Sequence, residues 1–184
     1  MDRLHTRLAR FEDAFPGFLT EIVEGSVVAT PVTPYHGSTT QRVWTALEQQ
    51  LAPGWGLVSR AAFPFDDGNE FCPDLAVIPE RDIARNDLAY PPHVIALVAE
   101  VVARGSVRRD YEIKPQMYAS RGIANHLLFD PLQGHAVTMW NPGPDGYRGR
   151  DTVPYGPDLV VDTPLGKLTI PTHALPVDPK APGR

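Results

Sequence analysis

Residues 94–102 read Val-Ile-Ala-Leu-Val-Ala-Glu-Val-Val, an apolar run that carries a single polar side chain, Glu100. Such a run predicts a strand in the middle of a sheet, buried on both faces. A glutamate is almost never fully buried alone, because its carboxylate loses hydration unless it is paired or bound to a cation. Glu100 is therefore either the partner of an arginine, with Arg104 and Arg121 as candidates, or a metal ligand.

A second acid, Asp74, directly follows Pro73 and precedes another apolar run, residues 75–78. Proline suits the first residue of a strand because it has no N–H for the ladder, so we expect Asp74 where the chain enters the sheet. Taken alone, Asp74 also fits an ordinary solvated strand end. Two carboxylates at the ends of neighbouring strands, however, are the oxygen ligands that a hard divalent cation prefers. A bound cation activates water and screens charge on a phosphate, which is the chemistry of metal-assisted phosphodiester hydrolysis.

Asp110 and Lys114 are four residues apart, a spacing that places both on one face of a regular helix. The Lys114 ammonium can orient a water or stabilise the transition state of hydrolysis. Pro115 is tolerated only in a first helical turn, so the regular helix is expected to begin between residues 111 and 114. Taken singly, Asp110 also fits an ordinary N-cap and Lys114 a surface charge.

Three arginines, Arg104, Arg108 and Arg109, fall within six positions shortly after Glu100. They are candidates for contacts with DNA phosphates, although a charge cluster also fits a solvated loop. The net charge of −5 argues against general coating of nucleic acid but allows a local basic patch.

The composition predicts one soluble domain, with 184 residues, 42% hydrophobic and 21% charged. No apolar run approaches the roughly 20 residues needed to cross a bilayer, so no membrane partner is expected. The single cysteine, Cys72, excludes an internal disulfide and fits a reducing compartment. These features predict a cytoplasmic protein.

The remaining patterns divide the chain into three segments. Residues 1–17 have apolar side chains at helical spacing and predict an amphipathic helix. Residues 18–170 predict a mixed β-sheet flanked by helices, an α/β fold. The proline-rich residues 171–184 predict a disordered tail. Within the domain we expect a hairpin around Glu24-Gly25, a helix capped by Ser38 or Thr39, and a helix at 111–121. Further strands are expected at 56–65, 74–78, 94–102, 126–130, 136–140, 147–152 and 168–170, with a polar loop at 80–92.

Several motifs occur in a specific order along the domain. They are Glu21-Ile-Val-Glu-Gly25, His36, Pro73-Asp74, Leu97-Val-Ala-Glu100-Val-Val, Arg109-Asp-Tyr-Glu-Ile-Lys114, Tyr118-Ala-Ser-Arg-Gly-Ile123 and Leu127-Leu-Phe-Asp-Pro131. This order resembles the Uma-two family of restriction endonucleases, a branch of the PD-(D/E)xK nuclease superfamily, over about residues 18–170.

The resemblance implies a restriction-endonuclease-like α/β fold with Asp74 and Glu100 as ligands of Mg²⁺ or Mn²⁺. It implies that Lys114 replaces the strand lysine of the superfamily, whose position is Val102 here. It also makes Glu21 an auxiliary acid near the metal, with Asp110 and His36 as auxiliary residues. Two departures concern the catalytic geometry: Ala103-Arg-Gly-Ser106 replaces a Ser-Pro-Ser-like loop, and Pro115 follows Lys114 directly.

The leading hypothesis is therefore a Mg²⁺-dependent endonuclease that hydrolyses DNA. One alternative is a catalytically inactive binding or regulatory module on a nuclease fold, because a fold does not determine a function. Another is a hydrolase of small phosphorylated molecules with the same metal site. A homodimer is expected for an endonuclease because two copies can cut both strands.

Overall fold

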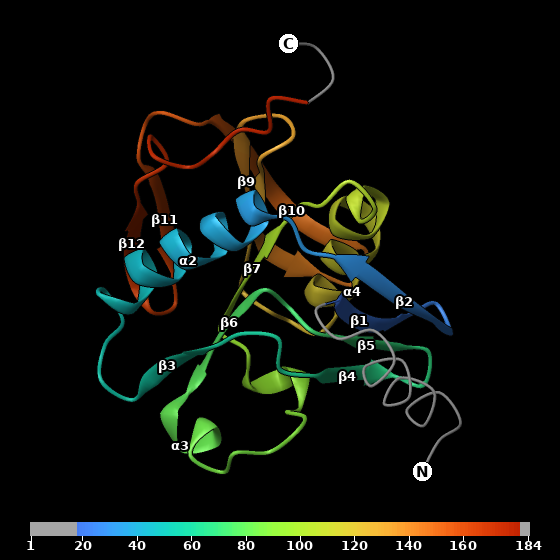
Figure 1. Cartoon of the computed structure of the whole chain (residues 1–184). Coiled ribbons are helices and arrows are strands. Elements are labelled where there is room, and N and C mark those ends of the chain that lie inside the picture. Colours follow the sequence, from blue (N-terminus) through green and yellow to red (C-terminus); the bar gives the residue numbers. More distant parts are fainter. Residues whose placement is uncertain (1–17, 181–184) are drawn as a thin grey trace.

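A six-stranded mixed sheet forms the centre of the molecule in the computed structural model, which describes residues 18–180. Its strand order is β10-β9-β8-β7-β6-β3, and among these pairs β7 and β8 alone run parallel (Figure 1). The strands are β3 (Trp55–Val58), β6 (Leu75–Pro79), β7 (Leu97–Val101), β8 (Asn125–Asp130), β9 (His135–Gly143) and β10 (Gly146–Pro154). The predicted α/β fold with a mixed sheet is confirmed, whereas the helix predicted for residues 1–17 lies outside the described residues.

A smaller antiparallel sheet, ordered β2-β1-β5-β4, lies beside the central one. Its strands are β1 (Phe18–Val23), β2 (Ser26–Pro31), β4 (Phe63–Asp66) and β5 (Asn69–Phe71). The turn between β1 and β2 has positive φ at both central residues, 48° at Glu24 and 76° at Gly25. This backbone matches the twist of a two-residue hairpin, so the predicted hairpin is confirmed.

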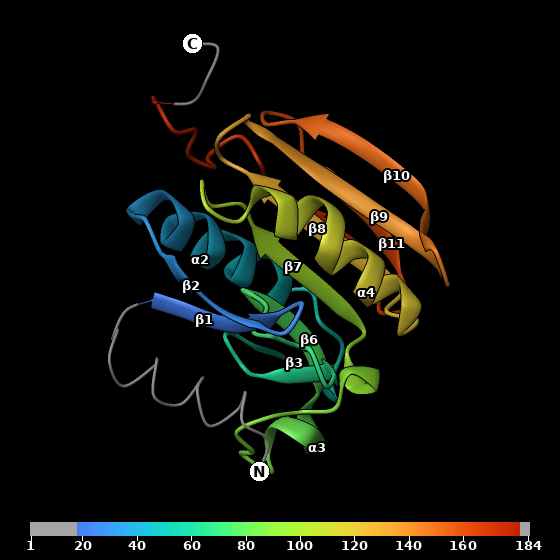
Figure 2. The same cartoon turned by 90° about the vertical axis from the view of Figure 1, so that its right-hand side faces the viewer.

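Helices cover both faces of the central sheet. Helix α2 (Pro34–Glu48) packs on one face together with the hairpin of β11 (Leu159–Thr163) and β12 (Gly166–Ile170). Helix α4 (Lys114–Ser120) packs against β9 and β10 on the other face, so β7 runs between α2 and α4 (Figure 2). A π-helical turn at Arg109–Ile113 leads into α4.

Strand β7 alternates between two environments, as a pleated strand must. Leu97, Ala99 and Val101 join the apolar core under α2 and the β11–β12 hairpin. Val98 points to the other core, which contains Tyr118 of α4. Glu100 has the same parity as Val98, so its side chain is also directed toward α4.

Several predicted boundaries were wrong for local reasons. Helix α2 begins at Pro34 rather than after Ser38 or Thr39, because the Thr33 hydroxyl accepts the cap hydrogen bond from His36 N. The predicted strand at 56–65 is divided into β3 and β4. The loop predicted at 80–92 contains the short helix α3 (Glu80–Ile83), and a 3₁₀ turn (Pro92–Val94) follows it. Strands β5 and β11 were not predicted.

The tail prediction fails for residues 171–180, which pack against the domain. Thr172 and Leu175 are buried, and the Thr172 hydroxyl accepts from Gly156 N and donates to the Pro157 carbonyl. Asp178 binds the Arg104 guanidinium at 2.9 Å. Buried apolar and hydrogen-bonded side chains hold this segment despite its prolines.

Candidate active site

The register of the central sheet brings the two predicted metal ligands together. In the antiparallel β6–β7 pair Leu75 faces Ala99, so the preceding residue, Asp74, reaches the position of Glu100. Asp74 N donates to Glu100 Oε2 at 3.3 Å, and Val101 N donates to Asp74 Oδ2 at 2.8 Å. Both acids are buried. The two side chains are therefore held by backbone groups of each other's strand.

Lys114 reaches Glu100 from the first turn of α4. Its Nζ lies 2.9 Å from Glu100 Oε1 and 2.9 Å from Glu21 Oε1, and the side chain is 1% exposed. Pro115 lies at the start of α4, directly after the π-helical turn. The ammonium thus stands beside the acids although Val102 occupies the usual strand position.

A π-helical turn carries Asp110 and leads directly to Lys114. Its wider backbone spans Arg109–Ile113 and ends at Lys114. Asp110 Oδ1 lies 3.9 Å from Lys114 Nζ, while the Ser106 hydroxyl donates to Asp110 Oδ2. Such turns are frequent at functional sites, but the sequence pattern predicted a regular helix.

Glu21 connects the small sheet to this cluster. Its Oε1 accepts from Cys72 N at 2.9 Å as well as contacting Lys114. Its Oε2 lies 3.1 Å from Arg109 Nε, without the alignment of a hydrogen bond. Oε1 of Glu21 is therefore placed to hold the lysine, while its Oε2, which accepts no hydrogen bond from the described residues, faces the Arg109 guanidinium.

The prediction of a phosphate contact is corrected for Arg109. Its side chain is 7% exposed, contacts Glu21 and Asp110, and donates to the Thr30 hydroxyl at 2.9 Å. Arg104 and Arg108 are more than half exposed, but Arg104 pairs with Asp178 and Arg108 with Glu24 and Glu112. Arg109 therefore balances buried acids, and the other two guanidinium groups lie at the surface.

His36 lies in the first turn of α2 and points at Asp74. Its Nε2 is 3.1 Å from Asp74 Oδ2, and the ring is buried. Burial would lower the pKa of His36, but the hydrogen bond and charge of Asp74 and the charge of Glu100 raise it above its usual value. The imidazole therefore steadies Asp74 and responds to its charge.

The cluster of Glu21, Asp74, Glu100, Asp110, Arg109 and Lys114 has excess negative charge; we call it the acid cluster. When all four carboxylates are ionised, they exceed the two permanent cations by two charges, which the His36 imidazole can offset only in part. Uncompensated charge in a buried site is costly. A divalent cation would supply the missing charge.

The titration of the acid cluster follows from this imbalance. Burial raises the pKa of Glu100 to about 7, with Asp74, Glu21 and Asp110 adding to the effect and Lys114 opposing it. Burial likewise raises the pKa of Asp110 to about 6. Burial would lower the pKa of Lys114, but Glu100, Glu21 and Asp110 raise it above its usual value. Lys114 is therefore an ammonium at neutral pH.

The donor set fits Mg²⁺ or Mn²⁺ with two protein carboxylates. Among residues 18–180, no group of three or more His, Cys, Asp or Glu side chains is arranged to hold a metal ion. Mg²⁺ usually needs only one or two carboxylates and takes its other ligands from water and substrate phosphate. The contacts of Asp74 within the described chain use Oδ2, so its second oxygen is available beside Glu100.

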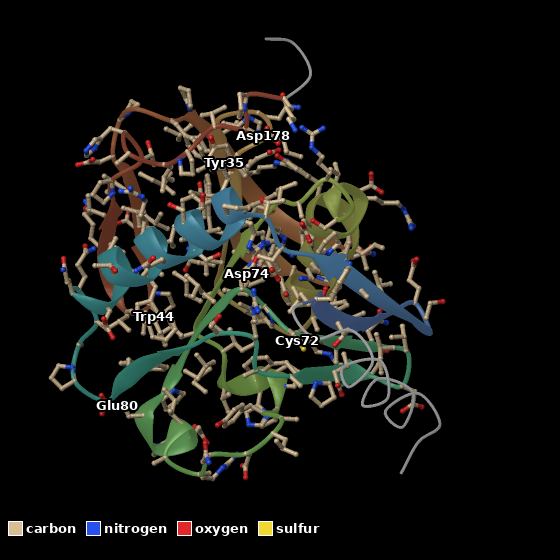
Figure 3. The ribbon with its side chains drawn as sticks, viewed as in Figure 1. Tyr35, Trp44, Cys72, Asp74, Glu80 and Asp178 are labelled. Carbon is tan, nitrogen blue, oxygen red and sulfur yellow. The ribbon has the colours of Figure 1, made fainter. Side chains whose placement is uncertain are left out.

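Asp74 also lines an open pocket of about 420 Å³ beside α2. In Figure 3, Asp74 lies near the centre of the molecule, between α2 and the strands of the small sheet. The pocket walls are Gly37, Thr40, Gln41, Trp44, Ser59, Arg60 and Asp74. A ligand can therefore reach the acid cluster from this side.

Two residues that contact the acid cluster were missed in the sequence. The Tyr118 hydroxyl donates to Glu100 Oε1 at 2.5 Å, and Ser106 holds Asp110. Tyr118 follows Lys114 by four residues on α4, so helical spacing could have indicated it. Ser106 lies four residues before Asp110 in a loop and had no comparable signal.

Among the described helices, none combines the length and hydrophobicity needed to span a bilayer.

The chain is similar to known proteins in its sequence pattern and in its fold. The model of the Uma2 family, described as "Putative restriction endonuclease", matches residues 7–173. The chain has no match among curated proteins. A solved structure described as a putative nuclease belonging to DUF820, from Anabaena variabilis, aligns with a TM-score of 0.61 and 14% identity. The alignment covers 79% of this chain and 81% of that chain, and at this identity it shows a shared fold.

Proposed function

Because the chain belongs to the Uma2 family, we propose that the acid cluster hydrolyses phosphodiester bonds of DNA with the help of Mg²⁺ or Mn²⁺. The family and the nuclease-like fold support a nuclease. The main support for the finer proposal is the contact of Asp74, which lines an open pocket, with Glu100, which in turn contacts Lys114.

Asp74 and Glu100 would hold the cation. A bound cation of this kind activates water and stabilises charge on the scissile phosphate. The Asp74 and Glu100 carboxylates are fixed by the Val101 and Asp74 backbone N–H groups, so little rearrangement is needed to present them.

Lys114 acts through its positive charge. Since the surrounding acids keep it protonated, it cannot remove a proton from water at neutral pH. It can stabilise charge that develops on the phosphate, and it holds Glu100 in place at 2.9 Å. Glu21 and Asp110 in turn position the ammonium.

Cleavage of plasmid and oligonucleotide DNA in Mg²⁺ or Mn²⁺ tests the proposal, with wild type compared with Asp74→Asn and Glu100→Gln. We expect each variant to lose about 100- to 1,000-fold in rate, as for other preorganised electrostatic groups. Glu112→Gln is the matched control, because Glu112 is an exposed acid near the same helix, and it should retain activity. Equal cleavage by wild type and both site variants would identify a contaminating nuclease and reject the proposal.

DNA binding without cleavage in any metal would instead favour the binding or regulatory module. Turnover of small phosphorylated molecules without DNA affinity would favour the third hypothesis. A homodimer and a cytoplasmic location remain predictions, and sedimentation of the full chain tests the first.

A further inference from the structure

The pocket beside Asp74 has a chemical character that differs from the acid cluster behind it. It combines an indole, a guanidinium and small polar side chains, and its volume of about 420 Å³ is in the range of small-molecule sites. Asp74 belongs to both the pocket and the acid cluster. A ligand in the pocket would therefore lie next to any ligand that Asp74 binds.

The Trp44 indole packs partly against the core and partly faces the pocket. It is half-buried and packs against the apolar core under α2, yet it also lines the pocket. Figure 3 shows Trp44 on α2, on the side of the helix near β3. A fixed indole at a pocket wall is a stacking surface for a flat ring, because little side-chain entropy is lost on contact.

Arg60 supplies positive charge at the same pocket. The residue is exposed, and within residues 18–180 no acidic side chain forms an ion pair with it. Its charge is close enough to oppose protonation of His36. The guanidinium is therefore available for a phosphate beside Asp74.

The backbone of Arg60 is held in an uncommon conformation. Its φ is 56°, a left-handed value that a residue with a side chain rarely adopts, and Arg60 N donates to the Pro73 carbonyl at 3.0 Å. This bond fixes Arg60 relative to Asp74, the residue after Pro73. Retained strain of this kind clusters at functional sites.

Resting on the proposed function, we propose that this pocket receives one unstacked nucleotide next to the scissile phosphate. Its base lies against Trp44 and its phosphate is bound by Arg60. A base inside a duplex must leave its stack to enter the pocket, and this unstacking costs free energy. The preferred substrate is therefore DNA with unpaired bases, and intact duplex is the weaker ligand.

Fluorescence anisotropy with labelled oligonucleotides tests the pocket separately from catalysis. The full-length chain is titrated in Ca²⁺ with a labelled thymidine 12-mer, the same 12-mer in a duplex, and an abasic 12-mer. Wild type should bind the single strand about 10-fold more tightly than the abasic strand, the usual effect of one stacked base. Trp44→Leu should lose this preference.

Arg60→Gln should weaken binding of every strand alike and reduce the salt dependence by about one phosphate contact. Trp55→Leu and Arg81→Gln are the matched controls. Trp55 is a half-buried tryptophan of the same core that does not line the pocket, and Arg81 is an exposed arginine of α3. Both controls should bind as wild type does.

The proposal is overturned if Trp44→Leu keeps the preference for the thymidine strand, or if wild type binds duplex more tightly than single strand. If wild type binds the single strand in a Trp44-dependent way but does not cleave DNA, the proposed nuclease function is rejected and the pocket assignment stands. If Trp44→Leu and Arg60→Gln cleave and bind DNA as wild type does, the pocket assignment is rejected and the nuclease function stands.

Discussion

The two faces of strand β7 carry out different tasks. One face presents Leu97, Ala99 and Val101 to the core under α2, and all three are almost completely buried. The other presents Glu100 to Lys114 and Tyr118. Burial on the first face stabilises the fold, whereas burial on the second opposes ionisation of an acid. Strand β7 thus holds in place a carboxylate whose burial is unfavourable when it is ionised.

The acid cluster differs from the apolar face because burial of its carboxylates does not stabilise the fold. Its excess of carboxylates over cations predicts that removing an acid and removing a cation have opposite effects on stability. Four substitutions test this difference in stability.

Lys114→Met should have the largest effect, lowering the free energy of unfolding by about 3–5 kcal/mol, because it leaves buried acids uncompensated. Denaturant unfolding at neutral pH measures the loss. The double variant Lys114→Met, Glu21→Gln should recover part of it, since one of the uncompensated carboxylates is gone. A double variant that is no more stable than Lys114→Met alone would contradict the charge imbalance.

Leu97→Ala should lower the free energy of unfolding by about 2–5 kcal/mol, because it opens a cavity in the core under α2. The same denaturant experiment measures it. Nuclease activity per folded molecule should remain near that of wild type at low temperature. If Leu97→Ala loses activity while its stability is unchanged, the apolar face of β7 serves the active site and not only the core.

His126 lies fully buried beside Tyr118, and within the described residues neither ring nitrogen has a hydrogen-bond partner. Burial, together with the charges of Lys114 and Arg150, lowers the pKa of His126 to about 3. The unfolded chain takes up this proton below about pH 6.5, so the histidine makes stability fall as the pH falls from there toward 3. The slope is at most about 1.4 kcal/mol per pH unit.

His126→Phe should remove this part of the pH dependence while keeping an aromatic ring against Tyr118. Unfolding curves of both proteins between pH 7 and pH 4 give the difference directly. Because the acids of the cluster are the same in both proteins, their contribution cancels. Parallel curves for variant and wild type would contradict the assignment.

Glu100→Gln should have the smallest effect on stability, a change between zero and a gain of about 1 kcal/mol, because it removes one excess negative charge. Thermal unfolding without metal measures it. A loss of several kcal/mol would mean that Glu100 stabilises the fold as a simple partner of Lys114.

Local sequence patterns predicted most of the elements and the candidate residues. An apolar strand with one acid, a Pro-Asp strand start and a lysine four residues after an aspartate are all visible in the chain. The π-helical turn before α4 was less accessible. That turn has no signal in apolar spacing.

Long-range pairing accounts for the remaining errors. Arg109 follows Arg108 in sequence, yet one is buried against Glu21 and the other is exposed, and only the distant β1 strand decides this. Residues 171–180 have the composition of a disordered tail, but Thr172 and Leu175 find partners in the domain. Arg60 and Trp44 meet across a pocket formed by three separate segments.

Calorimetric titration of the full chain with Mn²⁺ tests whether the acid cluster is a divalent-cation site. We expect one cation per chain with millimolar or tighter affinity in wild type, loss of this binding in Asp74→Asn, and unchanged binding in Glu112→Gln. Wild type that binds no Mn²⁺ or Mg²⁺ at millimolar concentration, or Asp74→Asn that binds as wild type does, would contradict the account.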